Sequence, residues 1–115
     1  MEIIVMKPGQ AERIEIGPNM NAYFKLKTWD LSFPIECAFD YSPETPNPFY
    51  EVYVSMSAAK PTRNNCASRF TDQKFKINHD SRVEWLYFTI SAMNEVKMKI
   101  VLHPFVGNWV WKMRE

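Results

Sequence analysis

The feature that most constrains this chain is an alternation of apolar and polar residues that recurs between Phe49 and Phe105. Strand-forming residues at a period of two, separated by Pro, Asn and Asp, are typical of antiparallel strands. In this stretch the alternation predicts strands at 49–57, 74–77, 83–92 and 95–102. Between the last two, Met93-Asn94 predicts the tight corner of a hairpin.

The first part of the chain repeats the signal. Alternation predicts strands at 2–6, 12–16, 21–27 and 35–41, with Pro and Gly marking turns at 7–9 and 17–19. The three prolines of 42–48 predict a loop, and 60–70 is the longest polar connection. About eight short strands separated by turns predict an all-β fold, an antiparallel β-sandwich.

Length and composition bound the organisation of the chain. Its 115 residues suit a single domain, 1–115, in which 106–115 forms a C-terminal tail or interaction segment. A hydrophobic fraction of 46% is too high for a disordered chain. With a net charge of +1 and interspersed signs, we expect no nucleic-acid partner. No apolar run is long enough for a membrane span or a signal peptide, so the sequence predicts a cytoplasmic protein or one domain of a larger protein.

The alternation also predicts which side chains face the core. We expect six residues to point inward: Phe24, Phe39, Val54, Phe75, Phe88 and Ile100. The charged positions of the same strands should be mostly exposed, namely Lys25, Asp40, Glu51, Lys97 and Lys99. A slip of one residue would exchange the two sets, because successive side chains point to opposite faces of a sheet.

A set of motifs in the middle and end of the chain resembles bacterial pre-peptidase C-terminal domains. These are VYVS at 52–55, KPT at 60–62 with the cysteine-bearing loop after it, and the paired aromatics of WLYF at 85–88. The resemblance covers roughly residues 21–105. It implies a small jelly-roll-like β-sandwich that serves as a non-catalytic appendage. The acidic run that precedes the Tyr-Val strand in that family is replaced here by Pro48-Phe49-Tyr50-Glu51, so no calcium ligands follow from the resemblance.

Tryptophans are the first candidates for contact with a partner. Trp29, Trp109 and Trp111 are large amphipathic side chains of the kind enriched at interfaces. The last two share a face if the tail is extended. Burial in the core and exposure to a partner remain equal alternatives for them.

Basic residues in the polar connection are the second candidates. Lys60, Arg63 and Arg69 form the most basic part of the chain. Such a patch fits an acidic partner, although a solvated surface is the simpler interpretation. We therefore predict a non-enzymatic module for protein–protein interaction that contains no cofactor, and we leave self-association open.

Alternatives from other classes carry weaker signals. Loop carboxylates at Asp40, Glu44, Glu51, Asp72 and Asp80 would suit a loop-end module for calcium, phospholipid or carbohydrate. His79, His103, Cys37 and Cys66 lie in no catalytic or metal-binding motif, and the two cysteines are expected to be free thiols. An enzyme is therefore the least favoured class.

Overall fold

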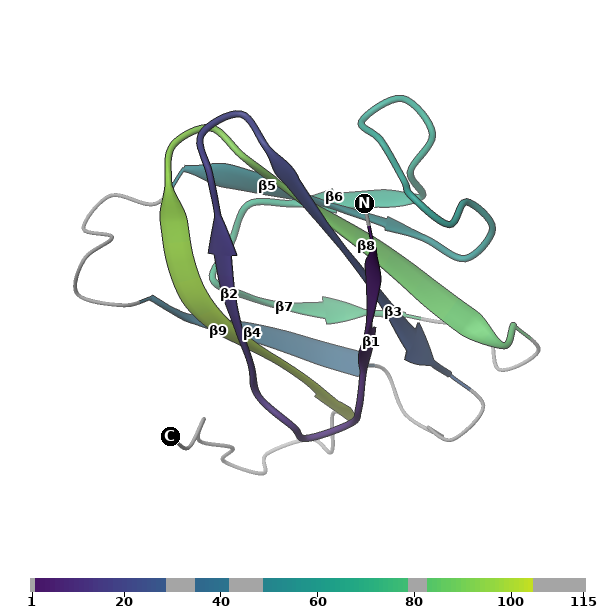
Figure 1. The fold of residues 1–115 in the computed structure, drawn as a ribbon. Coiled ribbons are helices and arrows are strands. Elements are labelled where there is room, and N and C mark those ends of the chain that lie inside the picture. The colour runs from purple at the N-terminus through teal and green to yellow at the C-terminus, as the bar shows by residue number, and fades with distance from the viewer. Residues whose placement is uncertain (1, 29–34, 42–48, 79–82, 105–115) are drawn as a thin grey trace.

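Two sheets packed face to face make up the protein (Figure 1). The computed structural model describes residues 2–28, 35–41, 49–78 and 83–104. Nine strands form within these ranges: β1 (Ile3–Met6), β2 (Glu12–Ile16), β3 (Asn21–Lys27), β4 (Ile35–Tyr41), β5 (Tyr50–Ser55), β6 (Ser68–Phe70), β7 (Lys74–Ile77), β8 (Trp85–Ala92) and β9 (Val96–Pro104). The predicted all-β sandwich is confirmed. No helix long and apolar enough to cross a membrane occurs in those ranges.

The sheets differ in size and in which strands they take from the chain. The larger sheet has five strands in the order β1-β3-β8-β5-β6, and the smaller has four in the order β2-β9-β4-β7. β8 lies inside the larger sheet, between β3 and β5, which explains why apolar residues occupy both of its faces. β9 lies between β2 and β4 in the same way.

Antiparallel pairs nest inside one another along the chain. β2 pairs with β9, β3 with β8, and β4 with β7. Three opposed pairs, one from each ladder, have the same midpoint in the sequence, Met56. These pairs are Ile14 with Met98, Phe24 with Phe88 and Ile35 with Ile77. The innermost pair, β5 with β6, is also antiparallel. The chain from β2 to β9 is thus one long hairpin folded over into two layers.

Two tight turns follow from their sequences. In Lys7–Gln10, the amide of Gln10 donates to the carbonyl of Lys7 at 3.1 Å, and Gly9 has a φ of 75°. The next turn repeats the arrangement: the amide of Met20 donates to the Gly17 carbonyl at 3.2 Å, and Asn19 has a φ of 59°. Pro at the second position and a left-handed residue at the third define a type II turn.

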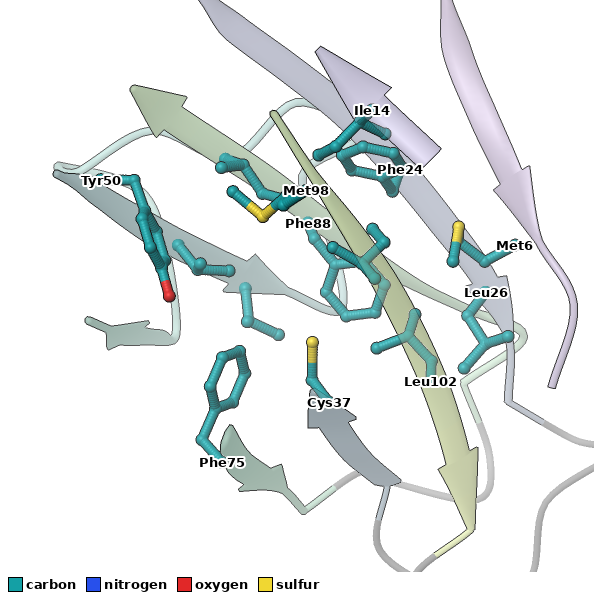
Figure 2. Close-up of a cluster of buried hydrophobic side chains, with 14 of the residues drawn as sticks. Met6, Ile14, Phe24, Leu26, Cys37, Tyr50, Phe75, Phe88, Met98 and Leu102 are labelled. Atoms are coloured by element: carbon teal, nitrogen blue, oxygen red, sulfur yellow. The ribbon is translucent and has the colours of Figure 1, made fainter. Parts of the chain in front are cut away.

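Alternate side chains from both sheets fill the core (Figure 2). Of the residues predicted to face inward, Phe24, Val54, Phe75, Phe88 and Ile100 are all buried, as expected. The side chain of Phe39 lies outside the described residues. Figure 2 shows Cys37 pointing between the sheets toward Phe88 and Leu102. A void of only about 10 Å³ remains beside these three side chains, so the core is tightly packed.

Two expectations about the strands are wrong, and one strand pair is parallel within an otherwise antiparallel sandwich. Met93-Asn94 does not close a hairpin, because β8 belongs to the larger sheet and β9 to the smaller. The turn instead carries the chain from one layer to the other. β1 pairs with β3 in parallel, so the sandwich is not wholly antiparallel. The polar connection 60–70 contains a strand, β6, of three residues.

The charged strand positions are less exposed than expected. Lys25, Glu51, Lys97 and Lys99 are half-buried rather than mostly exposed. Neighbours on the same face contact two of them: Lys25 lies over a tryptophan ring, and Glu51 accepts a hydrogen bond from a tyrosine. The side chain of Asp40 lies outside the described residues.

Candidate binding surface

The outer face of the larger sheet gathers aromatic and basic side chains from four strands. The registers place Tyr23, Thr89, Tyr53 and Arg69 in one row across β3, β8, β5 and β6. The next row pairs Lys25 with Tyr87, and the one after it pairs Lys27 with Trp85. We call this surface, with Lys60 and Arg63 at its border, the basic–aromatic face.

Lysines of the face lie against its rings. The Lys25 ammonium is 4.3 Å from the centroid of the Trp85 ring, and that of Lys27 is 5.8 Å away. A cation over an aromatic face is attracted by the negative charge above the ring, by about 0.5–1 kcal/mol at exposed sites. These contacts hold the lysines close to the sheet, so that the surface presents half-buried rings and fixed positive charge together.

The row through Thr89 is covered by its neighbours. Thr89 is 1% exposed although its position lies on the outer side of the sheet. Its hydroxyl has no hydrogen-bond partner among the described residues. Tyr23 and Tyr53 stand directly opposite it on the two adjacent strands. The two rings therefore screen the middle of the face from water.

Arg69 is held by a carboxylate at the border of the face. The Tyr53 hydroxyl donates to Glu51 Oε1 at 2.9 Å, and Arg69 Nε lies 3.6 Å from Glu51 Oε2. Burial, followed by the hydrogen bond to the Glu51 carboxylate, raises the pKa of Tyr53. The predicted partner residue Arg69 therefore has an internal partner, which weakens its case as a contact for a ligand.

Lys60 and Arg63 are the more available of the predicted basic residues. Both are exposed, and the Lys60 ammonium is 5.0 Å from the centroid of the Tyr23 ring. Hydrogen bonds hold their loop in place: the Ala67 amide donates to the Val54 carbonyl at 2.8 Å, and the Asn65 side chain accepts from the Thr62 amide. The loop thus keeps these two charges beside the sheet.

The outer face of the smaller sheet has a different charge pattern. There, opposite charges neutralise one another: Lys97 Nζ lies 3.8 Å from Glu15 Oε1, and Lys74 Nζ lies 3.4 Å from Glu36 Oε1. On the larger sheet, Glu51 is the one carboxylate among the outward positions of the described strands. The basic–aromatic face is therefore positive, although the chain as a whole is almost neutral.

Sequence reasoning located part of this surface. Lys60, Arg63 and Arg69 are on it or at its border, whereas Trp29, Trp109 and Trp111 lie outside the described residues. It missed Lys25 and Trp85, whose contact depends on the β3–β8 register. The signal was present as a row of Tyr23, Lys25 and Lys27 on one side of a strand, but a single strand does not reveal its neighbour.

Among the described residues, no three His, Cys, Asp or Glu side chains are close enough to hold a metal ion. Cys37 and Cys66 are free thiols. Burial raises the pKa of Cys37, and the adjacent Glu36 carboxylate raises it further, so its reactive thiolate is disfavoured. His79 and the His103 side chain lie outside the described residues.

Comparisons with models of protein families, with curated proteins and with solved structures found no significant match.

Proposed function

We propose that this protein is a non-catalytic β-sandwich module that binds an acidic segment of a protein partner through its basic–aromatic face. The observation that carries the proposal is the set of cation–ring contacts on that face. Carboxylates of a partner would meet the ammonium groups, and its apolar side chains would cover the rings. Aromatic residues and Arg are enriched at protein interfaces for this reason. Trp29, Trp109 and Trp111 remain proposed contacts of the same partner.

Other properties of the chain support this class of function. Its nested strand pairs support a jelly-roll-like connectivity, which agrees with the resemblance to pre-peptidase C-terminal domains, themselves non-catalytic appendages. The two free thiols support a cytoplasmic location, because disulfides persist mainly in oxidising compartments.

Charge reversal on the face tests the proposal. The probe is a fluorescent peptide of glutamates interspersed with tyrosines, and binding is followed by fluorescence anisotropy. The double variant Lys60→Glu/Arg63→Glu should bind it at least about tenfold more weakly, since two attractive charges become repulsive. Binding to the unmodified protein should weaken with added salt, because exposed charges are screened.

A matched control separates the face from overall charge. Lys7→Glu/Arg13→Glu makes the same change of charge at two exposed residues outside the basic–aromatic face. It should leave binding within about twofold of the unmodified protein. Equal losses in the two double variants would contradict a defined site. Tighter binding of single-stranded oligothymidylate than of the peptide would indicate that the partner is a nucleic acid and not a protein.

A second candidate, the loop-end module for phospholipid, is favoured by an apolar end of the sandwich. Met20, Phe49 and Met93 are 48%, 65% and 39% exposed. Backbone hydrogen bonds place them together: the Ala92 amide donates to the Met20 carbonyl, and the Met93 amide donates to the Phe49 carbonyl. Exposed apolar side chains that cluster in this way mark interaction sites.

Vesicle binding tests this candidate. Phe49→Glu should abolish co-sedimentation with phosphatidylcholine vesicles, because a carboxylate resists entry into lipid. Gln10→Glu adds the same charge in the exposed β1–β2 turn and should leave co-sedimentation unchanged. If the unmodified protein does not sediment with the vesicles, the lipid candidate is wrong.

A further inference from the structure

β1 is an edge of the larger sheet whose outer side is unpaired within the described part of the chain. It pairs with β3 on one side only, through Ile3 to Met6. Its sequence, Ile-Ile-Val-Met, has high strand propensity and contains no charge, Pro or Gly. A bare edge of this kind offers a row of backbone N–H and C=O groups to another strand.

The other three edge strands are protected. β2 carries exposed charges at Arg13 and Glu15, and β7 carries exposed Lys74 and Lys76. β6 has only three residues, one of which is Arg69. Charged side chains and short length are the usual devices that prevent edge-to-edge pairing. β1 has neither protection, and Val5 at its centre is 51% exposed.

A cleft lies beside β1, on the inner side of this edge. Its volume is about 460 Å³, and its apolar walls include Ile4, Ile16, Met20 and Ala22. These residues come from β1, from β2, from the β2–β3 connection and from β3, so the cleft lies where the margins of the two sheets meet. Because alternate side chains of a strand point to the same face, a strand added to β1 would direct every second side chain toward this cleft.

We infer that β1 pairs antiparallel with β1 of a second copy of this chain, about a two-fold axis at Ile4. The edge is self-complementary, as a two-fold contact requires. In this register Ile3 stands opposite the partner's Val5, and Ile4 stands opposite the partner's Ile4. Opposed β-branched residues are favourable cross-strand pairs. The partner's Ile4 then extends over the cleft, and Val5 loses its exposure.

Surface burial favours this register over its neighbour. Opposed residues must lie on the same face of the joined sheet, so the next allowed register is centred on Val5. It would place Ile3 opposite the partner's Lys7 and Ile4 opposite the partner's Met6. Met6 is already 2% exposed and gains little from a partner. The register at Ile4 covers the side chains that are still accessible.

Sedimentation velocity tests the pairing over a hundredfold range of protein concentration. The mass of the unmodified protein should rise toward twice the 13.6 kDa of one chain. Val5→Lys should remain a single chain throughout, because two lysines would meet near the axis. Thr71→Lys, which adds the same charge at an exposed β-branched residue outside β1, should dimerise like the unmodified protein. Circular dichroism checks that both variants keep the strand spectrum.

Cysteine cross-linking tests the register. In a Cys66→Ser background, Ile4→Cys should give a disulfide-linked dimer on mild oxidation, whereas Val5→Cys should not. Cys37 is buried and should not interfere. An unmodified protein that stays a single chain at every concentration would overturn the inference. So would a Val5→Lys variant that still dimerises, or cross-linking at Val5 in preference to Ile4.

Discussion

Cys37 shows how burial between the two sheets changes the ionisation of a side chain. It is 4% exposed and lies beside the small void between Phe88 and Leu102. Burial raises its pKa, since a thiolate in the core would lose its hydration. Cys66, in contrast, is half-buried in the loop, with its Sγ 3.7 Å from the Arg63 carbonyl oxygen.

This contrast predicts a loss of stability at alkaline pH. The unfolded chain releases the Cys37 proton above about pH 8.5, whereas the folded chain retains it. The stabilisation is therefore complete below the pKa of the unfolded thiol and is lost as pH rises above it. From about pH 8 to about pH 10 this one group should lower the free energy of unfolding by about 2 kcal/mol.

Urea denaturation of the unmodified protein and of Cys37→Ala at several pH values measures the effect. The variant keeps every other titrating group, so the difference between the two pH profiles belongs to Cys37. Parallel profiles would show that the thiol also ionises in the folded protein. A thiol reagent added to the folded protein should correspondingly modify Cys66 before Cys37.

Residue by residue, alternation predicted the core well because it depends only on the chain itself. Phe24 and Phe88 were assigned inward independently, and the structure places them opposite each other. The basic–aromatic face could not be predicted in the same way. Lys25 meets Trp85 only because β3 and β8 are neighbours, and no local pattern in either strand states that.

Among the elements, the turn between β1 and β2 depends most clearly on one residue type. Gly9 adopts a φ of 75°, and no atom lies within 4 Å of the position that a Cβ would occupy. Any cost of a side chain there is conformational rather than a steric clash. Gly9→Ala should therefore lower the free energy of unfolding by about 1–2 kcal/mol, which is the penalty of the left-handed region for an L-residue.

The comparison is with Gly17→Ala, measured by urea denaturation. Gly17 does not have a left-handed φ, and its added Cβ would meet Met20 Sδ at 3.3 Å. Because Met20 is exposed and flexible, it can move aside, so this variant should cost less than about 1 kcal/mol. A larger effect at Gly17 than at Gly9 would show that crowding, and not backbone conformation, limits these turns.

The predicted ends of a strand agree with the structure where apolar and polar residues alternate over several positions. β2, β3, β4 and β7 begin and end as predicted. β6 was missed because three residues are too few to show a period. The sequence predicted the chain reversal at Met93-Asn94 but not that it connects the two sheets. A tight turn has the same sequence pattern whether it joins two paired strands or strands of different sheets.

At the scale of the molecule, the nesting of strand pairs around Met56 determines which segments depend on one another. Each sheet is completed by a strand from the far end of the chain: β8 joins β3 to β5, and β9 joins β2 to β4. Before these two strands are in place, only the β1–β3, β4–β7 and β5–β6 pairs can form.

During translation these two central strands are synthesised after the strands that they join. β8 and β9 are the last of the described strands to leave the exit tunnel, yet both sheets require them at their centres. Until these two strands emerge, the apolar faces of the earlier strands, including that of β1, lack part of the cover that they have in the folded sandwich. The sandwich can therefore close only after β9 has left the tunnel, and until then the emerging chain exposes apolar surface that favours aggregation.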